Sequence, residues 1–152
     1  MYMRGFTLIE TLVVLAISSV VLVSVFAGFF GFTTSFTLSS INEDAISLVR
    51  KAREQTLSSE GGVSYGIHFD PDSITLFTAP TFDENDSDNE RYDLPDGFTI
   101  IQINLVGGTS DAIFTKLTGA TDQFGTVVIQ KKNNPAVQSV IHIYESGVVQ
   151  IE

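Results

Sequence analysis

The first third of the chain contains a long run without charged residues. No Asp, Glu, Lys or Arg occurs between Thr11 and Asn42, and within that run Leu12–Phe32 consists largely of Leu, Val, Ile, Ala and Phe. An α-helix rises ~1.5 Å per residue and the hydrocarbon core of a bilayer is ~30 Å thick, so roughly 20 apolar residues cross it. The pattern therefore predicts a helix long enough to span a membrane.

Beyond this run the apolar residues adopt a helical spacing. Within residues 36–57 they follow one another at steps of four, three and four, which draws a single stripe along a helix; the positions are Ile41, Ala45, Leu48 and Ala52. The pair Gly61-Gly62 then provides a stop signal. We expect one helix from Phe6 to about Ser59, with the stripe of its second half packed against a sheet.

After Gly62 the period of the apolar positions changes from about 3.6 to 2, which indicates strands separated by polar turns such as Asp70–Ser73 and Asn133–Pro135. Short connections between strands favour antiparallel pairing. The predicted fold class is therefore α+β, a long N-terminal helix on a mainly antiparallel sheet. Six or seven strands are expected, at Val63–Phe69, Ile74–Thr78, Phe98–Val106, Ala112–Leu117, Thr126–Lys132, Val137–Tyr144 and Val148–Ile151.

Composition limits the chemistry of the chain. Its 152 residues are the size of one ordinary domain plus at most one appended element. The formal net charge of −10 repels phosphate backbones, so nucleic acid is not an expected partner. The absence of Cys excludes disulfides, thiolate nucleophiles and sulfur-ligated zinc. His68 and His142 are expected on different strands, and we expect no enzyme activity.

Three interpretations of the apolar run compete. A secretory signal has an apolar stretch of about 7–15 residues followed by small residues at a cleavage site, whereas this run is longer and carries Phe29, Phe30 and Phe32 near its end. A plain membrane anchor explains the length but leaves Glu10 unexplained. An acidic residue in an apolar helix costs about 2.5–3.5 kcal/mol on insertion scales, so it normally has a cationic partner.

The third interpretation supplies that cation. The segment Arg4-Gly5-Phe6-Thr7-Leu8-Ile9-Glu10-Thr11-Leu12 resembles the processing and methylation motif of type IV prepilins and type II secretion pseudopilins. The resemblance implies cleavage by a prepilin peptidase between Gly5 and Phe6, followed by N-methylation of the new Phe6 amine. It also implies that Glu10 of one subunit pairs with the Phe6 amine of its neighbour during assembly. Pairing within one helix is an open alternative, since the two residues lie one turn apart.

The same resemblance implies an organisation into four parts: a leader peptide (1–5), a transmembrane and assembly half of the helix (6–32), an amphipathic half (33–60) and a β-rich head (61–152). The partners it implies are other pilin or pseudopilin subunits, the prepilin peptidase and methyltransferase, an inner-membrane assembly platform and the lipid bilayer. Arg4 precedes the span, and the positive-inside bias keeps that end cytoplasmic. We therefore expect a single-pass protein of the bacterial inner membrane, with its head in the periplasm or outside the cell, that joins a filament after assembly.

Two segments beyond the transmembrane half resemble the pseudopilin H/FimT-like group of minor pilins. They are the Ala52–Thr56 segment and the C-terminal I-x-I-x-x-x-G-x-V-x-I pattern of Ile141–Ile151. The resemblance implies a structural minor pilin or pseudopilin subunit; the alternative is an adhesin or a ligand or DNA receptor on the same anchor. The basic tail that DNA-binding members need is replaced by Gln150-Ile151-Glu152, and Arg50-Lys51-Arg53 is interpreted as a solvated helix face.

The segment Asp83–Asp96 carries seven acids and one base. Four carboxylates at alternating positions could converge on Ca²⁺, which takes about six to eight oxygen ligands; they are Glu84, Asp86, Asp88 and Glu90. The EF-hand pattern does not match in any register. We expect a solvated, mobile surface loop, with ion binding as the alternative, and no other cofactor.

Overall fold

The computed structural model describes residues 7–58 and 62–152, with side chains for all of them except 27–35. Backbone contacts divide the chain into two compact units, residues 1–37 and 38–152. The buried core cluster lies entirely within the second unit, from Ile41 to Val149. This unit, called the head below, therefore has its own hydrophobic core.

One helix, α1 (Leu8–Leu57, 50 residues), runs through both units. Its observed end lies two residues before the expected one at Ser59, and the expected start at Phe6 lies outside the described residues. The predicted stripe is confirmed, because its four members are all buried; they are Ile41, Ala45, Leu48 and Ala52. Exposed polar and charged residues occupy the opposite face of this stretch, which gives the helix one side for packing.

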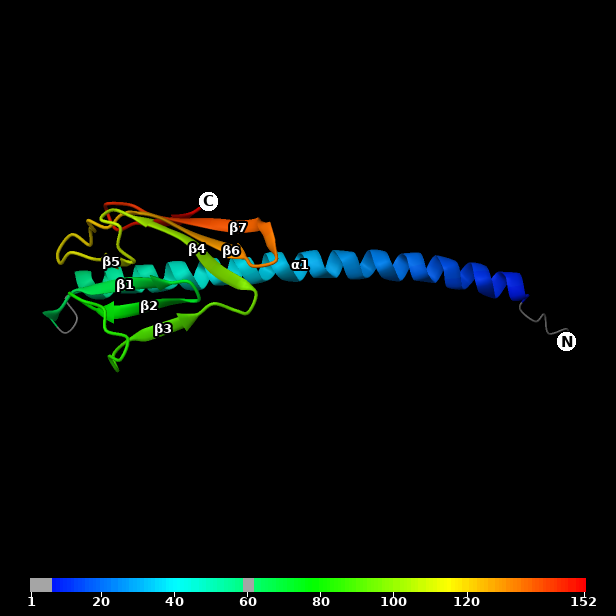
Figure 1. The fold of residues 1–152 in the computed structure, drawn as a ribbon, viewed down its shortest axis with the longest axis horizontal. Helices are drawn as coiled ribbons and strands as arrows, with labels where there is room; N and C mark the ends of the chain where they lie inside the picture. Colours follow the sequence, from blue (N-terminus) through cyan, green and yellow to red (C-terminus); the bar gives the residue numbers. More distant parts are fainter. Residues whose placement is uncertain (1–6, 59–61) are drawn as a thin grey trace. The chain divides into compact units, whose positions relative to one another are not determined.

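Within residues 62–152 the structure contains eight strands in two antiparallel sheets (Figure 1). Sheet A has the order β3-β2-β1-β5 and sheet B the order β4-β6-β7-β8. The strands are β1 (Tyr65–Asp70), β2 (Ser73–Thr78), β3 (Glu90–Asp93), β4 (Phe98–Leu105), β5 (Asp111–Ile113), β6 (Gly125–Lys131), β7 (Asn134–Ile143) and β8 (Val149–Ile151). Both sheets and the second half of α1 contribute to one core cluster, and Figure 1 shows that part of the helix running alongside both sheets.

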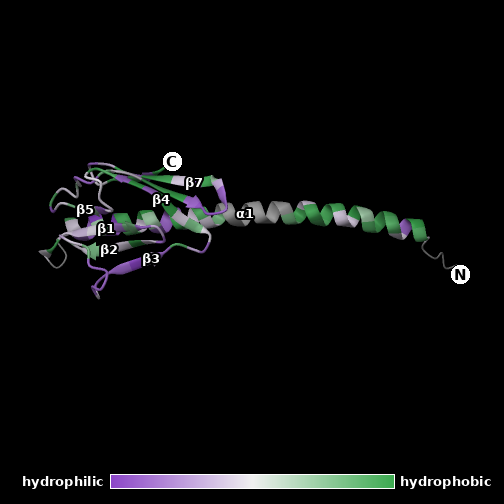
Figure 2. Cartoon of the chain, in the orientation of Figure 1, coloured by the Kyte–Doolittle hydropathy of each residue, from purple (hydrophilic) through white to green (hydrophobic). Residues whose placement is uncertain are grey.

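The expectation of one sheet with six or seven strands was wrong in two respects. The head has two sheets, and β3 lies inside the acidic segment that was expected to be a mobile loop. Figure 2 shows why the strand was missed, since β3 is hydrophilic along its length and offers no apolar alternation. Pairing with β2 defines β3 instead, with Arg91 opposite Thr75 and Tyr92 opposite Ile74.

Several strand ends also differ from their expected positions. The first strand begins at Tyr65 instead of Val63, and β5 ends at Ile113 instead of Leu117. A tight turn replaces the rest of β5, because the N–H of Thr115 donates to the Ala120 carbonyl and Leu117 has a positive φ of 72°. The strand β7 already begins at Asn134, so the predicted Asn133–Pro135 turn is shorter than expected.

Candidate functional site

The start of α1 is the first part of the candidate site. The N–H of Glu10 lies 3.3 Å from the Thr7 hydroxyl and 3.1 Å from the Thr7 carbonyl oxygen. Thr7 is therefore the N-cap of the helix, and Glu10 stands three residues later, as in a capping box. A carboxylate in the first turn is also favoured by the partial positive charge of the helix N-terminus. The cap therefore sets the start of α1 and places Glu10 in its first turn.

The two other predicted site residues at this end, Gly5 and Phe6, lie outside the described residues, so cleavage and methylation stay predictions. Thr7 was not singled out from the sequence. The spacing Thr7-x-x-Glu10 before an apolar run is a capping-box signal that could have identified it.

The helix that follows is long and apolar enough over Leu8–Phe26 to cross a membrane. None of these 19 residues is buried within the protein. Three hydroxyl groups in the stretch donate to carbonyl oxygens of their own helix, Thr11 to Leu8 at 2.8 Å, Ser19 to Ala16 at 2.8 Å and Ser24 to Val20 at 3.0 Å. This internal bonding leaves no hydroxyl proton of these three residues to be desolvated on transfer into an apolar environment.

In the head, the two segments that carry the second resemblance contact each other. The Nε–H of Arg53 donates to the Gly119 carbonyl oxygen at 3.1 Å. Gly147, in the turn between β7 and β8, packs over the same carbonyl, where a Cβ would lie 1.8 Å from the Gly119 oxygen and 3.0 Å from Arg53 Nε. Arg53 thus connects α1 to the turn before β8, and its role is structural. Sequence reasoning missed this contact because it joins residues far apart in the chain.

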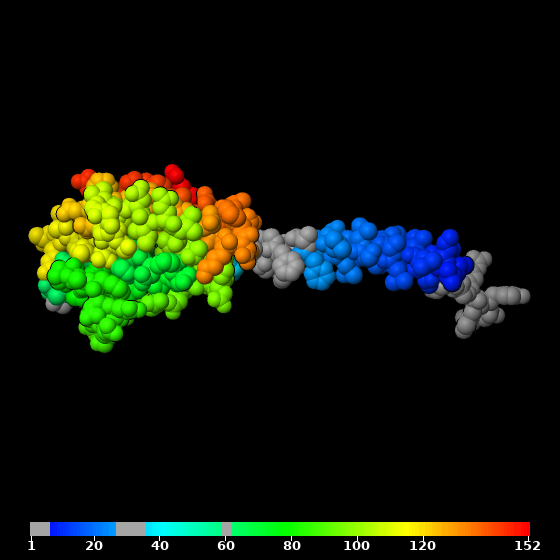
Figure 3. All heavy atoms as spheres, in the orientation of Figure 1, coloured from blue at the N-terminus to red at the C-terminus, as the bar shows by residue number. Residues whose placement is uncertain are grey.

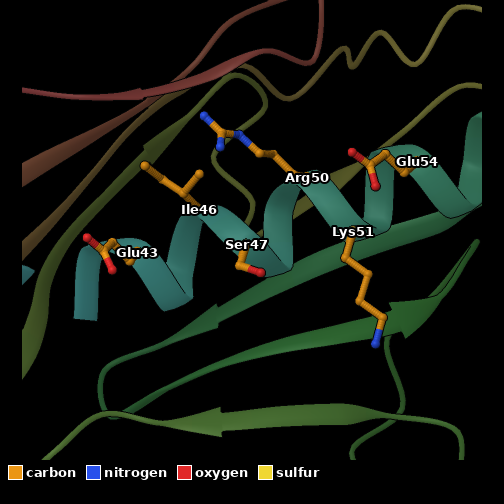
Figure 4. Close-up of a pocket in the computed structure, with 6 residues that line it drawn as sticks. All are labelled: Glu43, Ile46, Ser47, Arg50, Lys51 and Glu54. Carbon is orange, nitrogen blue, oxygen red and sulfur yellow. The ribbon is translucent and has the colours of Figure 1, made fainter. Parts of the chain in front are cut away.

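The basic cluster on α1 does not form a uniform positive surface. Lys51 forms an ion pair with Glu90 of β3, and Arg53 is held at Gly119. Arg50 is exposed, and Figure 4 shows it on α1 among the residues that line a pocket, which include Glu43 and Glu54. Alternating charges of both signs fit the expected solvated helix face better than a phosphate-binding patch.

The acidic segment is more ordered than expected. The Asp83 carboxylate accepts the Asn85 N–H at 3.0 Å, and the Asp86 carboxylate accepts the Asp88 N–H at 3.0 Å. Glu90 is paired with Lys51. Within residues 7–58 and 62–152, no three His, Asp or Glu side chains are grouped so as to hold a metal ion. Calcium binding by Glu84, Asp86, Asp88 and Glu90 stays a prediction.

Beside this segment, β3 is fastened to the helix by a second polar contact. Tyr92 is hydrogen-bonded to Asp44 of α1, and burial together with that bond and the negative charge of Asp44 raises the pKa of Tyr92 to about 12. The other contact is the ion pair of Lys51, which lies seven residues after Asp44 on α1, with Glu90, the first residue of β3. Two polar contacts therefore hold β3 against α1.

The two histidines do not come together. His68 lies on β1 of sheet A, and His142 on β7 of sheet B, as expected. The Nε2 of His142 lies 3.3 Å from the Glu152 carboxylate, its one acidic partner within residues 7–58 and 62–152. His68 is half-buried, with two carboxylates and an aromatic ring around it.

Comparisons with known proteins give a sequence match at the N-terminus and a structural match over most of the chain. The prokaryotic N-terminal methylation motif matches residues 1–26. Two crystal structures of the type IV minor pilin FimU from Pseudomonas aeruginosa have the same fold, each at 16% sequence identity. One has a TM-score of 0.61 and covers 80% of this chain and 92% of FimU; the other has a TM-score of 0.58 and covers 76% and 92%. No curated protein matches the sequence significantly.

These results confirm the expected α+β fold and the resemblance to the type IV pilin-like proteins. The motif supports it at the N-terminus, and the structural likeness supports it over most of the chain.

Proposed function

We propose that this chain, which carries the prokaryotic N-terminal methylation motif and has the fold of a type IV minor pilin, is a structural filament subunit. It is processed between Gly5 and Phe6, methylated at Phe6 and incorporated into a type IV pilus or a type II secretion pseudopilus. The observation that carries the proposal is the position of Glu10. It is the one acidic residue in the first turn of a capped helix whose next 16 residues, up to Phe26, are exposed and uncharged.

The chemistry of assembly follows from that position. Cleavage after Gly5 creates an α-amine, and Glu10 lies one helical turn beyond it. A carboxylate or an ammonium that is transferred out of water without a partner has a desolvation cost of several kcal/mol. Removing one partner of a buried ion pair has a similar cost. If the amine of an incoming subunit meets Glu10 of its neighbour, both costs are offset in one contact, which makes each addition selective for processed subunits.

The apolar helix provides the rest of the association. Every large hydrophobic residue of Leu8–Phe26 is between 51% and 78% exposed. These side chains can therefore exchange contacts with lipid for contacts with other helices. Small residues lie among them at Ala16, Ser19 and Ser24, which permits close approach of neighbouring helices. The helix serves as membrane anchor before assembly and as packing surface afterwards.

The location follows from the same reasoning. Before assembly the subunit crosses the bacterial inner membrane once, with Arg4 on the cytoplasmic side and the head on the other side. The prepilin peptidase and methyltransferase, the assembly platform and other pilin subunits are its partners. The head takes no catalytic role in this proposal.

The proposal is tested on the native chain isolated from membranes and from sheared filaments. Mass spectrometry of the N-terminal peptide should show a chain that begins at methylated Phe6 in both fractions. A Gly5→Val variant should retain its first five residues and stay in the membrane fraction, because a branched side chain blocks access to the scissile carbonyl. Native chains that retain residues 1–5 and are absent from every filament preparation would contradict the proposal.

A further inference from the structure

The outer face of sheet A carries a polar group of residues that the proposed function does not use. Successive residues of a strand point to opposite faces. Ile67 and Phe69 of β1 and Ile74 and Leu76 of β2 belong to the core cluster. The residues between them therefore share the outer face, where His68 lies directly opposite Thr75 and Asp111, and Asp70 lies opposite Ser73.

His68 has a carboxylate at each of its ring nitrogens. Its Nδ1 lies 2.5 Å from Asp111 Oδ1 of β5, and its Nε2 lies 3.3 Å from Asp70 Oδ1. The side chain is only 17% exposed. A neutral imidazole has one N–H donor and one lone pair, whereas an imidazolium has two N–H donors. Only the protonated ring can therefore donate to both carboxylates.

One residue of the connection between β2 and β3 stacks on this histidine. We call residues 79–89 the strap; it lies at the surface of the head (Figure 3). Phe82 of the strap stacks on the His68 ring with centroids 3.9 Å apart and an angle of 8° between the ring planes. The same Phe82 ring meets Phe77 edge-on at 5.5 Å. A cation over an aromatic face is attracted to it, so the stack is stronger with the protonated ring.

Two buried hydroxyl groups on the same face of sheet A make the docked position of Phe82 less favourable. Ser73 and Thr75 are 1% and 2% exposed, and their hydroxyl oxygens have no hydrogen-bond partner among the described residues. Thr75 lies opposite His68 and two residues before Phe77, the two side chains that Phe82 contacts. Burying an unpaired hydroxyl is unfavourable. Withdrawal of Phe82 would open the face beside Thr75 to water, so docking depends on the contacts of Phe82 with His68 and Phe77.

The other charges around His68 are few. On β2 the opposing residue is the uncharged Thr75, and beyond it on β3 stands Arg91, which pairs with Asp93 at 2.6 Å. Arg91 also experiences the charges of Asp70 and of Glu84 in the strap. Among the side-chain types in this group, carboxylates, a guanidinium and an imidazole, only the imidazole ordinarily changes its charge between about pH 5 and pH 8. His68 is the one member of this group that can switch there.

We propose that His68 is a pH-sensitive latch for the strap: the imidazolium, held between Asp70 and Asp111, binds Phe82, and loss of its proton releases residues 79–89 from sheet A. Deprotonation removes one of the two N–H donors and places a lone pair against a carboxylate oxygen. It also removes the charge that Phe82 faces. The surface that the head presents around its most acidic segment therefore differs between acidic and alkaline media. The latch depends only on the head and not on the proposed filament role.

The chain offers a direct measurement, because it contains only two histidines. The full chain in detergent micelles, with ¹⁵N- and ¹³C-labelled histidine, is followed by NMR from about pH 5.5 to pH 8.5. The Phe82 ring shifts the carbon-bound protons of His68 upfield while the strap is docked. The difference in these shifts between wild type and Phe82→Leu measures docking at each pH. His142, with its single acidic partner, reports in the same spectra that each variant is folded.

We expect both nitrogens of His68 to be protonated at low pH, with a large upfield shift relative to Phe82→Leu. At high pH the difference should fall by at least half, in step with loss of the His68 proton. The thermal midpoint should also fall more with pH in wild type than in His68→Gln, while His142→Gln should retain the wild-type dependence. A ring-current difference that stays constant while His68 loses its proton would overturn the proposal, as would its absence at every pH.

Discussion

The contact between Arg53, Gly119 and Gly147 makes a quantitative prediction about the stability of the head. Gly147→Ala places a methyl group where the Gly119 oxygen lies 1.8 Å away, at a φ of +75°. The left-handed conformation costs a non-glycine residue about 1–2 kcal/mol. The methyl group also displaces the Gly119 carbonyl and the Arg53 Nε beside it, which breaks the hydrogen bond between them, worth about 0.5–1.5 kcal/mol and more for a charged donor. The sum is about 3 kcal/mol.

Gly108→Ala is the matched control. Gly108 has a similar φ of +67°, but a Cβ there meets nothing within 4 Å. That variant therefore incurs only the conformational cost of about 1–2 kcal/mol. For a domain of this size, 1 kcal/mol lowers the melting temperature by about 4 °C. We expect a loss of roughly 10–12 °C for Gly147→Ala and roughly 4–8 °C for Gly108→Ala.

The assay is thermal unfolding of the head, residues 38–152, followed by circular dichroism. This unit contains the whole of the buried core cluster, so it can be studied without the apolar helix start. A third variant, Arg53→Gln, should lose less than Gly147→Ala, because it removes the hydrogen bond without forcing the turn apart. Equal losses for Gly147→Ala and Gly108→Ala would refute the packing argument.

Three further predictions concern other parts of the molecule. Thr7→Ala should weaken the start of α1 by about 1 kcal/mol and raise amide exchange in its first turn in micelles, whereas Thr7→Ser should not; equal exchange in both variants would exclude the cap. The pKa of Tyr92 is raised to about 12, so the folded head keeps this proton to higher pH than the unfolded chain does. The stabilisation from protonated Tyr92 is therefore fully present below about pH 10 and is lost as the pH rises towards 12. Tyr92→Phe should flatten this decline in the melting temperature, and an unchanged decline would contradict the prediction. Calcium at millimolar concentration should not shift the melting temperature of the head, because Asp83 and Asp86 bind backbone N–H groups and Glu90 binds Lys51; a rise that Glu84→Gln and Asp88→Asn abolish would establish the ion site instead.

The local spacing of residues was enough to predict the helix. The stripe from Ile41 to Ala52 is buried as expected, because the positions of side chains around a helix depend only on their separation in sequence. The same is true of β1 and β2, whose alternation and Asp70–Ser73 turn lie within 14 consecutive residues, 65–78. These elements carry their signal in neighbouring residues.

The missed features depend on residues far apart in sequence. The strand β3 has the composition of a loop and becomes a strand because β2 pairs with it and α1 holds it through Asp44 and Lys51. The division into two sheets has no local signal either. In the candidate site, Glu10 was identified by its motif, and Thr7 could have been. The contact of Arg53 with Gly119 and the surroundings of His68 require the fold itself.

The central claim is that the Glu10 carboxylate meets the Phe6 amine of a neighbouring subunit. It is tested most directly by co-expressing wild type with Glu10→Gln or Glu43→Gln and measuring the ratio of each variant to wild type in sheared filaments by mass spectrometry. Both substitutions neutralise one exposed acidic side chain of α1, but only Glu10 lies in its first turn. We expect Glu10→Gln to be processed and to reach the membrane normally while its share in filaments falls at least tenfold, and Glu43→Gln to be incorporated like wild type. Equal incorporation of Glu10→Gln and wild type would contradict the claim.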